Sequence, residues 1–243
     1  YTYLGAAPDT DIVVVKLKEC KPYLREFHML PEDVPAYMES DIMLGVKYIH
    51  SFLRVLNEPV VICLGLGTNM GDHAGSSMLA RYLNELSVQR NVGIVVSGGN
   101  EGNKEHHFMG LLQQQTVASD SNYQEVELRV GSGEVGFWME LWGSIPDIFN
   151  IQIRSPGGES IPKIRLGTGQ SYNHRFVYDR TRITIVNLIA EEISGEQLIL
   201  VRFEEPTEGI WVIRVYGEGT IHNGVFNIWL PISQFLHSRT TFL

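Results

Sequence analysis

The chain has 243 residues, of which 44% are apolar and 19% are charged, and its formal net charge is −9. Since a domain takes roughly 150 residues, this length predicts one large domain or two small ones, able to bury a core without metals or disulfides. The excess of 28 acidic over 19 basic residues disfavours binding to nucleic acid or anionic lipid, and we expect neither as a partner.

No apolar run approaches the ~20 residues that span a bilayer, and no basic segment followed by an apolar one opens the chain. We therefore expect no membrane span and no signal peptide. The two cysteines, Cys20 and Cys63, lie far apart, which does not predict a disulfide framework.

Continuous apolar runs rich in β-branched residues recur in the first half of the chain. They cover residues 12–17, 60–64 and 93–97, and such runs are typical of parallel strands buried on both faces. Helical spacing of apolar residues fills the two intervals, over residues 42–56 and about 76–90. The order strand, helix, strand, helix, strand predicts a parallel α/β sheet.

Capping residues predict where these two helices begin and end. One apolar stripe marks the first helix: Ile42, Val46, Ile49, Leu53 and Leu56. Ser40 or Asp41 is expected to cap its start and Pro59 to end it. Ser76 is expected to cap the second helix, and Gly93 follows soon after its end.

After about Ser119, short strand-like runs alternate with clusters of Gly, Pro, Asn and Asp. We expect eight or nine strands, drawn from residues 125–130, 137–142, 148–153, 161–166, 174–178, 182–189, 197–203, 210–216 and 225–230. Short strands at nearly even spacing predict an antiparallel sandwich or jelly roll. A polar stretch at residues 112–124 predicts the boundary between an α/β unit at residues 1–118 and an all-β unit at residues 119–243.

Two glycine-rich turns follow the predicted strands of the first half. Residues 65–71 read GLGTNMG, and the third glycine lies one position too late for a dinucleotide fingerprint, so a flexible turn is favoured. Residues 97–102 read SGGNEG, where the missing Cβ atoms would let a peptide backbone approach closely. The Asn100 amide could donate to a developing oxyanion there, and an Asn-capped turn is the alternative.

In chain order, three segments resemble the subtilisin-like serine proteases, peptidase family S8. GAAPDTDIVVVK at residues 5–16 resembles the family's G-V-A-P segment and the strand after it. VICLGLG at residues 61–67 resembles its V-I-N-x-S-L-G strand, and VVSGGNEG at residues 95–102 resembles V-V-A-A-G-N-x-G.

The details resemble most the clostridial Csp-like subtilases associated with spore germination. GTNMGDHAGSS at residues 67–77 and the pair His106-His107 after GNEG are similar to that group. A jelly-roll domain follows in these proteases, and residues 137–142, 155–159 and 227–231 look like its strands. The resemblance covers essentially the whole chain and implies a secreted or spore-associated location.

This resemblance implies a set of site residues. Asn100 would be the oxyanion-hole donor, and two substrate-binding segments would flank the specificity pocket: Gly65, Leu66 and Gly67, and Ser97, Gly98 and Gly99. Gly65 replaces the usual Ser, and Ser97-Gly98 replaces Ala-Ala, so side-chain preference is left open. No cofactor is implied, and calcium, common in the family, finds no acidic loop with ligand spacing here.

In that family the Asp and His of the catalytic triad precede the first matched segment, and the Ser follows the inserted domain. We therefore expect the chain to be the central portion of a protease whose substrate is a peptide or protein. We expect it to be inactive alone. The exposed apolar edges and faces of an incomplete sheet predict either self-association or a rearranged α/β half packed on the jelly roll.

For several residues we favour a structural role over a functional one. Ser77 resembles the family's nucleophile motif but precedes Asn100, so helix capping is the better interpretation. His73, His106 and His107 lack metal-ligand spacing and are expected on the surface or in turns. The four tryptophans lie inside apolar strands and are expected to pack in the core: Trp138, Trp142, Trp211 and Trp229.

Two other functions stay open. The parent protein could be a non-catalytic pseudoprotease or regulatory module that acts through the jelly roll. Residues 119–243 could form a lectin-like binding domain, in which the tryptophans would make a carbohydrate platform.

Overall fold

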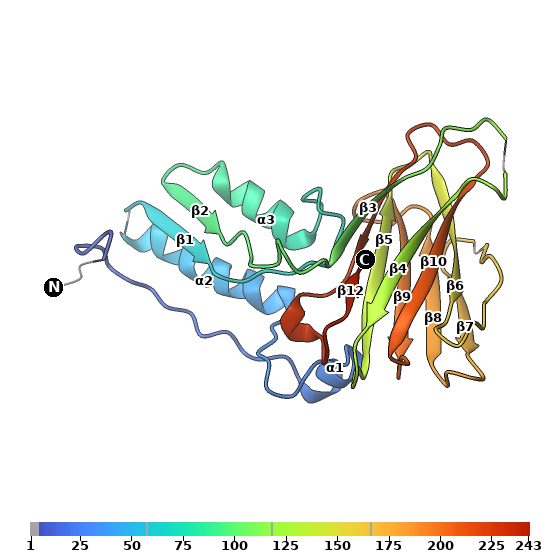
Figure 1. Ribbon diagram of the computed structural model, residues 1–243. Coiled ribbons are helices and arrows are strands. Elements are labelled where there is room, and N and C mark those ends of the chain that lie inside the picture. Colours follow the sequence, from blue (N-terminus) through green and yellow to red (C-terminus); the bar gives the residue numbers. More distant parts are fainter. Residues whose placement is uncertain (1–4, 57, 118, 166) are drawn as a thin grey trace.

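The computed structural model describes residues 5–56, 58–117, 119–165 and 167–243 (Figure 1). It combines few helices with mostly antiparallel sheets. The helical segments are α1 (Pro22–Phe27), α2 (Glu39–Leu56), α3 (Met78–Ser87) and the 3-10 turn η1 (Ser233–Phe235). The strands are β1 (Val60–Leu64), β2 (Val92–Val96), β3 (His107–Leu111), β4 (Tyr123–Val130), β5 (Gly136–Gly143), β6 (Ile148–Arg154), β7 (Gln170–Arg175), β8 (Arg182–Leu188), β9 (Gln197–Glu204), β10 (Gly209–Glu218), β11 (Val225–Trp229) and β12 (Thr241–Phe242).

The N-terminal part contains a small parallel sheet. β1 and β2 pair in parallel, from Val60 opposite Val92 to Leu64 opposite Val96. Helices α2 and α3 supply the apolar side chains of a small core, in which Val46, Ile62 and Leu86 are buried. The predicted strands at 60–64 and 93–97 and both predicted helices are therefore present.

The first predicted strand, at residues 12–17, is wrong. The described chain is extended there but unpaired, and the side chains of Ile12 and Val14 are 82% and 80% exposed. A Cβ built on Gly45 of α2 would lie 3.2 Å from Cγ1 of Val15, so the segment runs along this helix. A β-branched run forms a strand only beside a partner strand, and the described parallel sheet consists of β1 and β2 alone.

The helix starts also differ from the sequence predictions. Ser40 and Asp41, expected as caps, lie inside the first turn of α2, which begins at Glu39. Ser77 rather than Ser76 caps α3. Of the predicted stripe on α2, the side chains of Leu53 and Leu56 lie outside what the structure describes.

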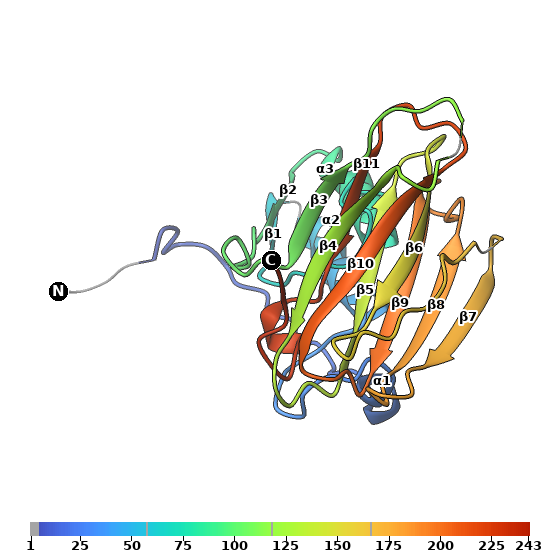
Figure 2. The same ribbon diagram turned by 45° about the vertical axis from the view of Figure 1, so that its right-hand side comes forward.

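Two antiparallel sheets face each other in the C-terminal part (Figure 2). One has four strands in the order β12-β4-β10-β6, and the other has six in the order β3-β11-β5-β9-β8-β7. Alternate residues of both sheets point inward and form one continuous apolar core that includes Leu128, Met139, Ile151, Phe203 and Trp211. The expected sandwich of short strands is therefore formed.

Several strands of the sandwich differ from those predicted from the sequence. The predicted strand at residues 161–166 is reduced to isolated bridges, such as Ile151 with Ile164, and Leu166 lies outside the described residues. The strand predicted at 174–178 is β7, which ends at Arg175. Strand β3, which was not predicted, pairs with β11 although it precedes the proposed boundary at residues 118/119. That boundary stays a prediction, and Ala118 itself is not described.

No helix in the described part of the chain is long and apolar enough to cross a membrane. Cys20 and Cys63 are both free thiols.

Candidate functional site

The predicted substrate-binding segments leave the carboxyl ends of adjacent parallel strands. Ser97 N–H donates to the carbonyl of Leu64 at 3.0 Å, and Ser97 Oγ donates to the carbonyl of Leu66 at 3.1 Å. The structure thus brings segment 65–67 beside segment 97–99. Both are exposed, and a Cβ built on Gly65, Gly67 or Gly98 would meet no atom within 4 Å. An extended chain could therefore approach this backbone without steric hindrance.

Asn100 continues the second segment and is exposed to solvent. Gly99 before it has a φ of +74°, a left-handed conformation that favours glycine. The next residue, Glu101, anchors the turn to the sandwich: its Oε2 accepts from the backbone N–H of Ser233 at 3.0 Å and from Ser233 Oγ at 2.8 Å. The turn that presents Asn100 is therefore fixed one residue later by η1.

The buried His106 adds to this anchor. Its Nδ1 lies 3.0 Å from Oε2 of Glu101, and its ring is only 5% exposed, so the expectation of a surface position is wrong for this histidine. Burial lowers the pKa of His106, and the neighbouring Glu101 carboxylate opposes that shift. The side chain was misjudged because β3, which follows it directly, was not predicted.

The loop after β1 is anchored to the sandwich at a second place. Gly71 N–H donates to Oε2 of Glu140 on β5 at 2.7 Å, and the same oxygen accepts from Nε1 of Trp142 at 2.9 Å. Burial raises the pKa of Glu140, while the bonds from Gly71 and Trp142 and the charge of His73 act against the rise. Glu140 was not predicted, although a lone carboxylate between two tryptophans on an apolar strand was a visible signal.

Two imidazoles enclose Trp229 beside this carboxylate. The ring of His73 stacks on the indole at 3.6 Å between centroids, and the ring of His107 stacks at 3.7 Å, with interplanar angles of 13° and 11°. At such distances the two rings must cover opposite faces of the indole. Trp229 lies opposite both His107 and Glu140 in strand register, so three neighbouring strands contribute to the contact.

Ser77, the candidate decoy nucleophile, has a structural role. Its Oγ accepts from the backbone N–H of Ala80 at 3.1 Å and caps α3. A second backbone amide in the first turn of this helix, that of Leu79, has no acceptor within the helix and donates to Oε1 of Glu39 at 2.7 Å. Helix capping, the interpretation favoured from the sequence, is confirmed.

The tryptophans do not form an exposed platform. Trp211 is fully buried and meets the rings of Phe176 and Phe203 edge to face, as expected for a core residue. The other three occupy the outer face of the six-stranded sheet. Trp142 is buried there, Trp138 is half-buried against Phe27 of α1, and Trp229 is enclosed as described.

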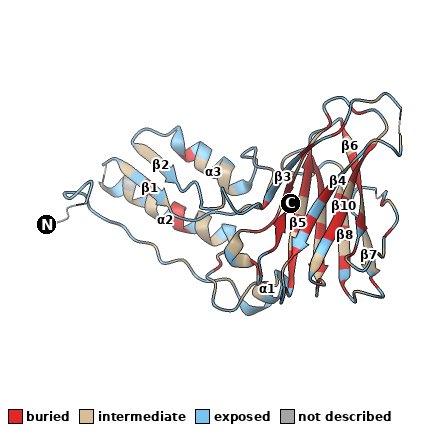
Figure 3. Cartoon of the chain, in the orientation of Figure 1, coloured by how far each residue is buried: buried red, intermediate tan, exposed pale blue. Residues whose placement is uncertain are grey.

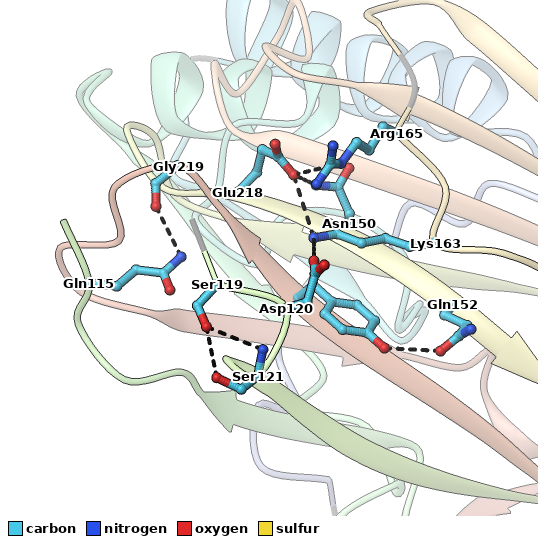
Figure 4. A network of polar contacts seen from close by, with 11 residues as sticks. Gln115, Ser119, Asp120, Ser121, Asn150, Gln152, Lys163, Arg165, Glu218 and Gly219 are labelled. Atoms are coloured by element: carbon cyan, nitrogen blue, oxygen red, sulfur yellow. Dashed lines mark hydrogen bonds and ion pairs between the residues drawn. The ribbon is translucent and has the colours of Figure 1, made fainter. Parts of the chain in front are cut away.

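A polar network lies at one end of the four-stranded sheet (Figure 4). Oε2 of Glu218 accepts from Asn150 at 2.8 Å and lies 3.2 Å from Nε of Arg165. Lys163 bridges Glu218, at 3.7 Å, and Asp120, at 3.3 Å. The groups satisfy one another and hold the 119–121 turn against β6 and β10, so the network is structural. In the described part of the chain no three His, Cys, Asp or Glu side chains are grouped so as to hold a metal ion.

The architecture is thus a parallel α/β pair whose exposed loops are bound to the outer face of a two-sheet sandwich. Among solved structures, it is similar to that of the Clostridium perfringens CspB protease, with a TM-score of 0.74 and 28% sequence identity. The similarity covers 88% of this chain and 43% of the protease chain, so the chain spans less than half of that protein. No protein-family model and no curated protein sequence matches the chain. The neighbour is a clostridial Csp protease, in agreement with the Csp-like resemblance of the sequence.

Proposed function

We propose that this chain is the central portion of a subtilisin-like serine endopeptidase, in which the jelly-roll sandwich follows the substrate-binding strands. The observation that carries the proposal is the pair of open loops at the carboxyl ends of β1 and β2. Their sequences resemble the family motifs, and the arrangement of most of the chain is similar to that of a protease. The intact parent would hydrolyse peptide bonds by Ser–His–Asp acyl transfer, with the triad supplied by segments outside these residues.

The chain's own residues would act on the bound peptide in two ways. Segments 65–67 and 97–99 would hold an extended substrate by backbone hydrogen bonds on both sides. The Asn100 amide would donate to the oxygen that becomes negative in the tetrahedral intermediate. Such a donor is effective when it is oriented before the reaction. Glu101, the next residue, holds the turn in place through its contacts with Ser233 and His106.

The test is substitution in the intact parent protein. Asn100→Ala should lower kcat by roughly 10²–10³ while KM changes little, because the lost donor acts on the transition state. Asn103→Ala, in the exposed turn just beyond, is the matched control and should retain activity. Equal turnover of both variants would contradict the role of Asn100.

The isolated 243-residue chain should hydrolyse neither casein nor a chromogenic peptide. Turnover that a serine-directed inhibitor blocks would overturn the proposal that the triad lies elsewhere.

A non-catalytic pseudoprotease is the second candidate, since sandwich and loops would be retained in either case. A parental sequence without the family's Asp, His or Ser motifs would decide for it. A lectin-like role for residues 119–243 is disfavoured because the described tryptophans are buried or covered.

A further inference from the structure

A cavity of about 640 Å³ lies between the α1 region and the end of the sandwich where β7, β8 and β9 meet. Its volume falls within the range of ligand sites. Five guanidinium groups line it: Arg25, Arg175, Arg180, Arg182 and Arg202. Four carboxylates also line it: Glu26, Glu32, Glu204 and Glu205. None of these residues belongs to the glycine-rich loops, so this is a separate feature of the molecule.

The β7–β8 hairpin concentrates positive charge on one wall. Arg175 and Arg182 are direct cross-strand partners, and like charges placed opposite each other destabilise a sheet. Arg180 lies in the turn between them. The hairpin therefore places three guanidinium groups around one opening, in a chain whose net charge is −9.

The carboxylates of the cavity neutralise only part of this wall. Glu204 is shared, with Oε2 at 3.7 Å from Arg182 and Oε1 at 3.2 Å from Arg202. Arg25 is occupied by the carbonyls of Pro31 and Glu32. Within the described residues, neither Arg175 nor Arg180 forms an ion pair.

Aromatic and apolar side chains also border the cavity. The guanidinium of Arg202, on the same sheet as Arg175 and Arg182, lies 5.3 Å from the ring of Phe27 and 5.4 Å from that of Trp138. Apolar atoms of Met29, Leu30 and Val135 complete the lining. The lining of the cavity thus combines two guanidinium groups, those of Arg175 and Arg180, that form no ion pair among the described residues with a few apolar side chains.

We propose that this cavity binds a peptide segment that carries acidic side chains. A carboxylate would pair with Arg175 and Arg180, whose planar guanidinium groups match it in bidentate geometry, and an adjacent apolar side chain would contact Met29, Leu30 and Val135. The overall negative charge of the chain repels acidic peptides in general, so binding has to come from this local group.

The test measures binding to the 243-residue chain by fluorescence anisotropy. The probe is a labelled, N-acetylated and C-amidated peptide, Glu-Leu-Glu-Glu, so that all its carboxylates are side chains. We expect saturable binding that weakens as NaCl rises from about 50 to about 300 mM, because salt screens the attraction between carboxylates and guanidinium groups. The same peptide with Gln at each Glu position should bind at least about tenfold more weakly.

Substitutions locate the site. Arg175→Gln with Arg180→Gln should weaken binding of the acidic probe at least tenfold. Arg129→Gln with Arg154→Gln, the same change of charge at exposed strand positions of the other sheet, should leave it within about twofold. The Tm of the first pair should not fall, because Arg175→Gln removes one of two like charges that lie opposite each other.

Three outcomes would overturn the proposal. The first is equal binding of the Glu and Gln probes, or no binding of either. The second is equal loss in both arginine pairs, which would mean general electrostatic attraction. The third is a fall in Tm that accompanies the loss of binding, which would assign these arginines to folding.

Discussion

The two halves of the molecule differ in how they bury their strands (Figure 3). In the sandwich, buried side chains from both sheets recur along most strands and form one core. In the α/β part, Ile62 is buried beneath the helices, whereas Val61 beside it is 63% exposed. A parallel strand normally has both faces covered, and here the described residues cover one.

This difference assigns separate tasks to the halves. The sandwich has the core that makes it stable, while the glycine-rich loops belong to the less buried half. Glu101 and Glu140 link the two, each through hydrogen bonds between a loop and the sandwich. The sandwich therefore helps to position the candidate site, although the site itself lies in the α/β half.

The largest effect is expected from the core of the sandwich. Trp211→Ala should lower the free energy of unfolding by about 3–5 kcal/mol, because it leaves a cavity and removes the bond from its Nε1 to the carbonyl of Thr207. Chemical denaturation measures this. Val177→Ala, at a side chain that is 75% exposed, is the control and should change little. A small effect at Trp211 would mean that the sandwich core does not dominate stability.

A carboxylate that joins two turns of the sandwich should give the next largest effect. Burial acts to raise the pKa of Asp147, but the backbone N–H groups of Gly224, His222 and Asn223 outweigh it, so its pKa lies below the usual 3.8. The stabilisation is present above pH 3.8 and is lost as the pH falls through the pKa of the folded state.

Asp147→Asn should therefore cost about 2–4 kcal/mol at pH 7, and the difference from the wild type should shrink below pH 3.8. Urea unfolding at several pH values measures both. Asp9→Asn, at an exposed position, is the control. A pH-independent difference would contradict the role of the carboxylate charge.

The link through Glu140 should affect the α/β loop more than the sandwich. Glu140→Ala removes the acceptor of Gly71 N–H and should speed its amide exchange by an amount equal to about 1–3 kcal/mol. Glu140→Gln keeps an acceptor and should restore protection. Unchanged exchange in the Ala variant would show that the loop is held by other contacts.

Glu140 also predicts a pH dependence of the opposite sign to that of Asp147. Its pKa is raised above 4.5 in the folded chain, so its contribution to stability is complete below pH 4.5 and declines as the pH rises through the folded value. The wild type should lose stability relative to Glu140→Gln over that interval in urea unfolding. A constant difference would contradict the burial of this charge.

The smallest effect is expected at the start of α3. Ser77→Ala should destabilise the α/β part by about 1 kcal/mol, since one helix amide loses its acceptor. Ser77→Asp should retain the cap. Hydrogen exchange in α3 measures the change, and in the intact parent both variants should still hydrolyse peptides. Loss of all hydrolysis in both would reopen the nucleophile interpretation.

The sequence predicted the parts of the fold that local pattern determines. The runs at 60–64 and 93–97 became strands because each found the other as a partner, and most of the later strands appeared where turn residues bounded them. The run at 12–17 had the same composition and remained unpaired. Composition indicates that a segment can be a strand, whereas pairing depends on contacts that lie far away in the sequence.

The same limit applies to the site. Motif order predicted the two loops and Asn100 as site residues, a prediction that depends on neighbouring residues alone. Glu101 and Glu140 could not be assigned, since Ser233 and Gly71, their partners, are 132 and 69 positions away. His73 and His107 were expected on the surface or in turns, but their stacking on Trp229 depends on the register of β11 against β3 and β5.

That register gives the stacked indole a further consequence. Side chains alternate between the faces of a strand, so a slip of β11 by one residue would turn Trp229 inward and bring Ile228 or Leu230 to the outer face. His73 would lose its ring partner in the same step. The stacking of the His73 loop on Trp229 thus requires the native register of β11, so this loop can bind in its native position only after the sandwich strands have paired correctly.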